Sequence, residues 1–494
     1  MPLSDQIGGL DATALAELVA KKEVSASELL EATLARLDAA EPRLNAIAVD
    51  ARDRARSQAA GPLTGRFAGV PFPLKDIAQD YAGMRMTMGA VPLRDNIAIR
   101  NSAYVDRCLA AGLVVIGSTA TPELGLKGTT ETILRGATRN PWNPDRTPGG
   151  SSGGAAALVA GRVVPMAGAS DGGGSIRIPA AYCGLFGLKP SRGRVSEGPA
   201  IGESWEGAVC SHVLTRSVRD SAAMLDVLAG PEPGDPFVIP PPVRPYAQEV
   251  GADPGRLRIG FSARSPVGGA VAPEMTEAVA KAASLLESLG HHVEEAEPAI
   301  DGRLLARCYM GLYFGHVAAL VDEVRREKKA SESVFHPDTR ALALLGRAMS
   351  AESFVQLQSH WNGFARALGA FHASYDLFLT PVTAMGPARI GELETPEFLQ
   401  TMAKLTAVLG AGKLLLKSGI VDRLAYKNLE RTPFTQLANL TFVPAMSVPL
   451  HWGADGMPVG VQFTARFGEE HILLRLAAQL EQAAPWADRA PDLQ

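Results

Sequence analysis

The spacing of apolar residues near the start of the chain predicts two helices followed by a strand. Between Asp11 and Val49 the apolar residues recur at helical spacing, and Ser25 with Glu28 forms a capping-box pattern ahead of the second helix. The apolar row of that helix is made of leucines: Leu29, Leu30, Leu34 and Leu37. In residues 69–76, apolar side chains instead alternate with other residues, which predicts a half-buried strand.

Helix and strand patterns continue to alternate along the rest of the chain. Helical spacing covers residues 102–111, 273–289 and 469–482. Short apolar runs typical of strands lie at residues 113–116, 163–166, 256–261, around 293, 375–380, 445–450 and 459–464. Strands that alternate with helices favour an α/β fold with a largely internal sheet.

Two long segments depart from this alternation. Residues 231–245 contain seven prolines, which predicts a stiff surface segment. This segment is either a domain boundary or a belt that joins two halves of one sheet. Residues 301–430 are mostly helical in pattern and have few turn signals. Length alone, at about 150 residues per domain, suggests about three domains.

Composition and charge exclude several classes of protein. Hydrophobic residues make up 46% of the 494-residue chain and charged residues 20%, so the chain can bury a large core. The 48 Lys and Arg against 52 Asp and Glu lack the basic surplus of a nucleic-acid-binding protein. The four scattered cysteines fit neither a disulfide framework nor a zinc site, and no leader or membrane segment is visible. We therefore expect a cytoplasmic protein with no nucleic-acid or membrane partner and a homodimer as the default assembly.

Glycine and serine gather in one stretch that is a candidate for chemistry. Of the 50 glycines, 12 fall between residues 149 and 193, where Ser151 and Ser175 each lie in a glycine cluster. A phosphate-binding loop would need G-x-x-x-x-G-K-[ST], which is absent. Residues 149–153 match the G-x-S-x-G pattern, but a loop precedes them instead of the apolar strand that a nucleophile elbow needs. The histidines that such a hydrolase would need lie in helical or loop patterns: His316, His336 and His360.

Three segments together resemble the amidase signature family of hydrolases. They are Gly-Gly-Ser-Ser-Gly-Gly at 149–154, Gly-Gly-Ser-Ile-Arg at 173–177 and Gly-Val-Pro-x-x-x-Lys-Asp at 69–76. Ser151 and Ser175 are 24 residues apart, as in that family. Further matching stretches lie at 121–125, 140–143, 183–190, 439–441 and 456–462. Within the family the chain is most similar to the 6-aminohexanoate-cyclic-dimer hydrolases, through residues 233–235 and 244–248.

The resemblance implies a role for each polar residue of these segments. Ser175 would attack the amide carbonyl, Ser151 would relay its proton, and Lys75 would accept that proton as a neutral base. The peptide bond before Ser151 would be cis. Neutrality near pH 7 requires the pKa of Lys75 to fall from about 10.4, at a cost of about 4 kcal/mol that burial can supply.

The resemblance also implies an oxyanion site and a set of supporting side chains. The oxyanion would be held by backbone N–H groups of Gly172, Gly173, Gly174 and Ser175. Ser152 would order the loop, and we interpret Asp171 with Arg177 as a structural ion pair instead of a substrate contact. Many relatives have threonine where this chain has Gly172, so we expect a looser loop or a wider site.

The activity implied is that of an amidohydrolase without cofactor or metal, which cleaves linear or cyclic carboxamides through an acyl-Ser175 intermediate. The implied fold is α/β, with a mixed central sheet flanked by helices on both sides. One domain would span residues 1–494, with a signature core at about 65–230 and a helical substrate-cleft region at about 301–430. Candidate substrates are 6-aminohexanoate-type oligoamides, aryl amides and carbamates.

Several alternatives stay open at this level. The chain would instead be the glutaminase subunit of a tRNA-dependent amidotransferase if it worked in a complex, or a catalytically silent binding protein if the fold alone were retained. Aromatic residues in the helical region either line an acyl pocket or pack in the core: Tyr309, Tyr313, Phe314 and Trp361. Cys183 is expected to be a small core residue and not a reactive thiol.

Overall fold

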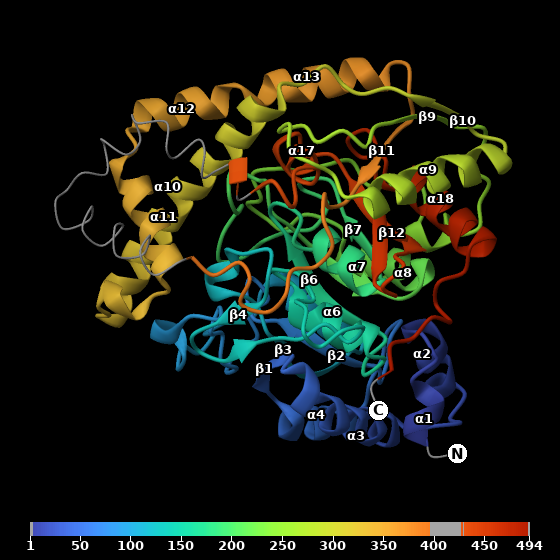
Figure 1. The fold of residues 1–494 in the computed structure, drawn as a ribbon. Coiled ribbons are helices and arrows are strands. Elements are labelled where there is room, and N and C mark those ends of the chain that lie inside the picture. The colour runs from blue at the N-terminus through green and yellow to red at the C-terminus, as the bar shows by residue number, and fades with distance from the viewer. Residues whose placement is uncertain (1–2, 396–425, 428, 493–494) are drawn as a thin grey trace.

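A large mixed sheet organises the molecule in the computed structural model, which describes residues 3–395, 426–427 and 429–492 (Figure 1). The sheet has eight strands in the order β10-β9-β11-β13-β12-β7-β8-β6. In that order the strands are His292–Glu295, Arg258–Phe261, Leu377–Pro381, Pro458–Thr464, Ala445–Trp452, Phe186–Lys189, Cys210–Thr215 and Met166–Asp171. The β10-β9-β11 pairs are parallel, whereas the remaining pairs are antiparallel. The predicted α/β fold with a mixed central sheet is confirmed.

A second, smaller sheet carries the lysine segment. It has the order β1-β3-β2, made of Ile47–Asp50, Val114–Thr119 and Pro71–Lys75. The strand β2 packs beside β6 of the large sheet and beside the helix α6 (Gly153–Ala160), as Figure 1 shows. All five residues of β2 are buried, so the prediction of a half-buried strand is wrong. Pro71 and Pro73, which alternate with the apolar residues Val70, Phe72 and Leu74, are buried as well.

Helices cover both faces of the large sheet. The core on one face combines strand residues with α8 (Val218–Leu228), α9 (Pro273–Ser288) and α18 (Glu470–Ala483). The core on the other face includes α6 and α7 (Arg177–Cys183), in which every residue is buried. Around this frame lie the hairpin β4-β5 (Glu131–Thr132, Gly136–Ala137) and the helices α1 (Leu3–Ile7), α2 (Ala12–Ala20), α3 (Ala26–Leu44), α4 (Arg52–Ala59), α5 (Ala103–Ala110) and α17 (Gln436–Leu440). Single 3-10 turns lie at Val91–Leu93, Glu123–Gly125, Tyr246–Gln248 and Glu332–Val334.

The predicted helical region is helical through its first half. It consists of α10 (Gly302–Lys328), α11 (Pro337–Ala348), α12 (Ala351–Ser359) and α13 (Trp361–His372), which extend beyond the large sheet in Figure 1. The strand β11 follows them, and residues 396–425 of the predicted region lie outside the described residues. By length and composition α10 is apolar enough to cross a membrane, but 67% of its most apolar window is buried inside the protein. This helix therefore has the burial of a core helix.

Local sequence signals place most element boundaries within a few residues. The capping box of Ser25 and Glu28 is formed at the start of α3. The strand expected at 163–166 begins only at Met166 and continues to Asp171, so that prediction was shifted. Small residues fill the later part of β6, and they give no alternation to detect. The proline-rich segment is held to the body by Arg107, which donates to the Pro231 carbonyl, and by Arg194, which donates to Pro240.

Candidate active site

Lys75 ends the strand β2 with its side chain fully enclosed. Its Nζ lies 2.8 Å from Ser151 Oγ, 3.0 Å from Ser170 Oγ and 3.3 Å from the Ser170 carbonyl oxygen. Burial lowers the pKa of Lys75 to about 7, although the charge of Asp171 acts in the opposite direction. A neutral amine at this position has a lone pair that can accept the proton of the Ser151 hydroxyl. The structure therefore brings together two of the residues that the sequence selected, from positions 76 residues apart.

The signature loop holds Ser151 against this amine. The peptide bond Gly150–Ser151 is cis, as the resemblance implied. Gly150 has no room for a side chain, because a Cβ there would meet the backbone of Lys127 and Thr129. Thr130 Oγ1 donates to the Gly149 carbonyl at 2.8 Å, which fixes the preceding residue. Ser151 is 4% exposed, so its hydroxyl is shielded from bulk solvent.

Ser175 lies where β6 gives way to α7, beside the signature loop. The backbone N–H of Ser152 donates to the Ser175 carbonyl oxygen at 3.3 Å, which joins the two serine segments directly. The side chain of Ser152 also links them, since its Oγ lies 3.3 Å from the Ser170 carbonyl oxygen. Ser175 keeps part of its surface exposed, whereas Lys75 and Ser151 are buried. Of the three residues, Ser175 is thus the one that a substrate can reach.

Hydrogen bonds within the glycine run before Ser175 show which backbone N–H groups are free to bind an oxyanion. The N–H of Gly174 already donates to Asp171 Oδ1 at 2.7 Å, so it is engaged within the protein. The carbonyl of Gly173 accepts from Thr435 Oγ1 at 2.6 Å and from Gln436 Nε2 at 3.2 Å, which fixes the orientation of that peptide. The backbone amides of Gly172, Gly173 and Ser175 remain the candidate oxyanion donors.

Asp171 and Arg177 form a buried ion pair at the base of this loop. Both side chains have no exposed surface, and Arg177 Nη2 lies 2.8 Å from Asp171 Oδ1. Arg177 also donates to Asn439 Oδ1 at 2.6 Å and to Gln462 Oε1 at 2.8 Å. Burial acts to raise the pKa of Asp171, but the Arg177 charge and hydrogen bonds from Arg177 and Asn439 hold it well below its usual range. Asp171 and Arg177 are thus engaged with each other and with side chains of α17 and β13, and their structural role stays a prediction.

Replacing Arg177 by methionine is expected to lower the free energy of unfolding by about 3–5 kcal/mol. The substitution leaves the Asp171 carboxylate buried without its cation. Urea unfolding followed by circular dichroism measures the loss. The matched control is Arg52→Met, which breaks partly exposed pairs with Asp38 and Asp50 and should cost about 1 kcal/mol or less. Equal losses in the two variants would contradict the structural role of Arg177.

Aromatic side chains cover the glycine run. A Cβ on Gly172 would meet Val209 and the Trp205 ring, so the space left by the absent threonine is filled, and the expectation of a wider site is not met at this point. Trp205 lies edge-on to Tyr313 with ring centroids 5.0 Å apart. A Cβ on Gly173 would collide with the Tyr309 hydroxyl, which places that phenol directly over the loop. Phe314 and Trp361 pack within the core of the helical region.

Several polar residues of the site were not found from the sequence. Ser170 contacts Lys75 Nζ, and Gln79 Oε1 accepts from the Lys75 backbone N–H at 2.7 Å. Thr435 and Asn439 reach the loop from α17 and the turn before it, more than 250 positions away. No local periodicity signals such distant partners. Cys183 is buried, and burial raises the pKa of its thiol, which agrees with a core role.

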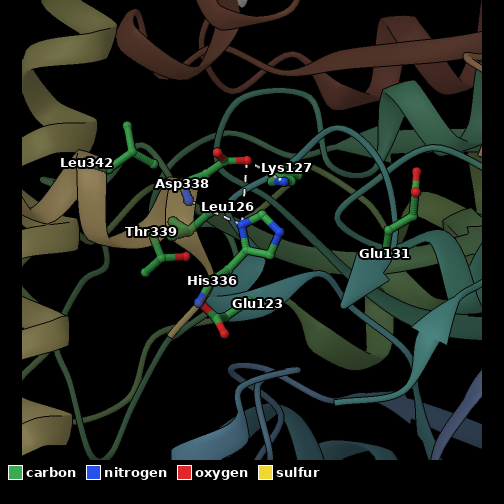
Figure 2. Close-up of a pocket in the computed structure, with 8 residues that line it drawn as sticks. All are labelled: Glu123, Leu126, Lys127, Glu131, His336, Asp338, Thr339 and Leu342. Carbon is green, nitrogen blue, oxygen red and sulfur yellow. Dashed lines mark hydrogen bonds and ion pairs between the residues drawn. The ribbon is translucent and has the colours of Figure 1, made fainter. Parts of the chain in front are cut away.

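A small cavity has a lining that includes none of Lys75, Ser151 and Ser175. Its volume is about 20 Å³, enough for one water molecule. Figure 2 shows the eight residues that line it: Glu123, Leu126, Lys127, Glu131, His336, Asp338, Thr339 and Leu342. Lys127 Nζ lies 2.6 Å from Asp338 Oδ2 across the cavity. Within the described residues, no group of three or more His, Cys, Asp or Glu side chains is arranged to hold a metal ion.

The fold is that of an α/β hydrolytic enzyme, and a buried lysine contacts a serine hydroxyl within it. Residues 28–474 match the family model described as Amidase, and the chain belongs to this family. It is an amide-hydrolysing enzyme.

Individual relatives extend over the whole chain. A 6-aminohexanoate-cyclic-dimer hydrolase of Pseudomonas sp. (strain NK87) is 39% identical, over 98% of this chain and 96% of its own. The solved structure of a 6-aminohexanoate cyclic dimer hydrolase complexed with substrate is 37% identical, with a TM-score of 0.88 over 98% of this chain and 99% of that chain. The solved structure of a glutamyl-tRNA(Gln) amidotransferase component from Thermotoga maritima is 24% identical, with a TM-score of 0.78 over 99% of this chain and 98% of that chain, and shares the fold alone.

The pH dependence of hydrolysis is expected to report the protonation of Lys75. Only the neutral amine can accept a proton, and below its pKa of about 7 the amine is protonated. We therefore expect kcat/KM to fall as the pH decreases through about 7, because kcat/KM reports the ionisation of the free enzyme. Initial rates measured from about pH 5 to about pH 9 test this. A profile that stays flat between about pH 6 and about pH 8 would contradict it.

Proposed function

We propose that this amidase cleaves its substrate through an acyl intermediate on Ser175, with Ser151 and Lys75 as the proton path. The observation that carries the proposal is the 2.8 Å contact between Lys75 Nζ and Ser151 Oγ in a fully buried setting. A serine hydroxyl is a weak nucleophile until a base takes its proton, and a desolvated lysine supplies that base. Asp171, Arg177 and Ser152 hold the loop in this proposal and do not touch substrate.

Both halves of the reaction use the same proton path. In each half, Lys75 first takes up a proton through Ser151 and then returns it. As Ser175 Oγ bonds to the carbonyl carbon, its proton passes through Ser151 to Lys75 Nζ. The negative charge on the carbonyl oxygen is held by backbone N–H groups of Gly172, Gly173 and Ser175. The carbon–nitrogen bond breaks as Lys75 returns the proton through Ser151 to the leaving amine. Water then repeats the sequence on the acyl-enzyme and releases the acid.

The proposed natural substrates are 6-aminohexanoate-type linear or cyclic oligoamides. Two findings support this class: the 39% identity to a 6-aminohexanoate-cyclic-dimer hydrolase and the TM-score of 0.88 to a solved enzyme of that name. Aryl amides and carbamates use the same acyl-transfer groups, because specificity depends on the shape of the pocket. The glutaminase alternative has only a shared fold at 24% identity behind it.

A substrate panel tests the proposal directly. Purified protein is incubated with cyclic and linear aminohexanoate dimers, anilides, carbamates, p-nitrophenyl esters and glutamine, and released amine or acid is followed by mass spectrometry. We expect the aminohexanoate dimers to give the highest kcat/KM. Preference for glutamine would instead support the glutaminase of an amidotransferase, and preference for anilides would assign an aryl amidase.

The remaining expectations are part of the same proposal. We propose one domain over residues 1–494, a cytoplasmic location, and a homodimer that binds a small-molecule amide and no nucleic acid. Light scattering after size-exclusion chromatography gives the mass of the assembly. A single cooperative unfolding transition would support one domain.

A further inference from the structure

A second polar contact of Lys75, besides that with Ser151, leads toward β6 and β8. Lys75 Nζ lies 3.0 Å from the hydroxyl of Ser170, which belongs to β6. Ser170 is the register partner of Ser211 on the neighbouring antiparallel strand β8. Directly opposed residues of an antiparallel pair project from the same face of the sheet, with Cβ atoms about 5 Å apart. Ser170 and Ser211 therefore lie side by side on one face of the β6–β8 pair.

The path ends on a carboxylate. Ser211 Oγ donates to Glu197 Oε1 at 3.0 Å, and Glu197 belongs to the connection between β7 and β8. Ser211 is 1% exposed and Ser170 is 6% exposed, so the two hydroxyls are enclosed, while Glu197 keeps part of its surface accessible. An amine, two hydroxyls and a carboxylate thus form one row from β2 across β6 and β8.

The charges around this row single out Glu197. Two carboxylates act on the Lys75 amine, namely Asp171 and Glu197. Asp171 is already paired with Arg177 at 2.8 Å, whereas Glu197 forms no ion pair with any described residue. Burial raises the pKa of Glu197 to about 7, with Asp235 acting in the same direction and Lys75 in the opposite one.

Two further titratable groups lie near this row of residues. Lys189 on β7 is buried, with its Nζ 3.7 Å from Cys210 Sγ on β8, and burial lowers the pKa of this amine. Burial raises the pKa of the Cys210 thiol, and the charge of Glu197 adds to that effect. The amine of Lys189 donates to the Pro190 carbonyl at 2.8 Å and contacts neither Lys75 nor Glu197. Lys75 and Glu197 are therefore the two groups of this row that can exchange charge near neutral pH.

We propose that Glu197 is a positioning residue that acts on Lys75 through Ser211 and Ser170 and sets the pH range in which this lysine serves as a base. An ionised Glu197 favours the protonated amine, and a protonated Glu197 favours the neutral one. The lysine can then take up a proton in one step and release it in the next, because neither its neutral nor its protonated form is strongly favoured. This inference rests on the proposed function, because it requires Lys75 to accept the proton of the nucleophile.

Glu197→Gln tests the proposal, because it keeps the shape of the side chain and removes its charge. The readout is the pH profile of kcat/KM with the best amide of the substrate panel. Removing the negative charge makes the neutral lysine more stable, so the acid limb should move to lower pH by about half a unit or more. At pH values well below the midpoint of the limb, the variant should then retain about threefold more of its own maximal kcat/KM than the wild type does. The matched control is Glu232→Gln, which removes a nearby carboxylate that pairs with Arg107 at 2.6 Å, and its limb should not move.

If the acid limb of Glu197→Gln coincides with the wild-type limb, the proposal is overturned, even if kcat changes. Glu197 would then only hold its loop in place and would not act on the protonation of Lys75. If Glu197→Gln does not fold, Ser211→Ala replaces it. This variant removes the hydroxyl that donates to the carboxylate, and it should move the limb in the same direction by a smaller amount. An unmoved limb there would also count against the proposal. Failure of the proposed function is distinguishable, since it would show as turnover that persists without Ser175.

Discussion

Replacing Ser175 by alanine is expected to lower kcat/KM for amide hydrolysis by about 10⁴-fold or more. The alanine variant has no oxygen that can form the acyl intermediate, while the backbone amides of the loop stay in place. Ser175 is partly exposed and its hydroxyl forms no hydrogen bond with a described residue, so the free energy of unfolding should stay within about 0.5 kcal/mol of wild type. Initial rates over a range of enzyme concentrations, together with urea unfolding, measure both quantities.

The control for this variant is Cys183→Ala at the end of α7, the helix that follows Ser175. Cys183 is fully buried and its Sγ lies 3.4 Å from the Pro148 carbonyl oxygen, so the substitution tests general disturbance near the signature loop. It should keep most of the activity. A Ser175→Ala enzyme that retains more than about one tenth of the wild-type kcat/KM would remove Ser175 as the nucleophile.

Replacing Lys75 by methionine should lower kcat/KM by about 10³-fold or more, because the proton of the nucleophile then has no base. Stability should not fall in parallel. The amine is fully buried, and methionine fills a similar volume without a group that requires solvation. Activity and stability are therefore expected to separate in this variant, which a purely structural lysine would not allow.

Two measurements complete this test. The residual activity of Lys75→Met should have lost the acid limb near pH 7, because that limb belongs to the lysine. The control is Lys281→Met, which removes an exposed lysine paired with Glu277 and should leave both rate and profile unchanged. A Lys75→Met enzyme with a normal acid limb would show that another group provides the base.

The sequence predicts the local elements well because their signals are local. The helix α3 is predicted by the row of leucines that ends at Leu37 and by the capping box at Ser25. Both signals lie within the helix itself. The strand β2 shows the limit of this reasoning. Its alternation predicts one buried face, but β6, α6 and α3 pack against the strand and all five of its residues are buried, which only the tertiary arrangement reveals.

The same distinction applies to the candidate site. Lys75, Ser151 and Ser175 were predicted because each lies in a motif with fixed spacing. Ser170 and Trp205 were missed, and Asn439 was noted in a matching stretch without a role, for different physical reasons. Ser170 and Asn439 act through contacts that the fold creates between distant segments. Trp205 lies in a loop with a left-handed backbone, at φ 54°, where no periodic pattern exists.

Labelling with a fluorophosphonate probe, followed by peptide mapping, tests the central claim most directly. The phosphorus of the probe bonds to an activated serine oxygen and stays there. We predict a single adduct on Ser175, absent from Ser175→Ala and formed much more slowly in Lys75→Met. An adduct on Ser151 or Ser152 with Ser175 unmodified would contradict the account.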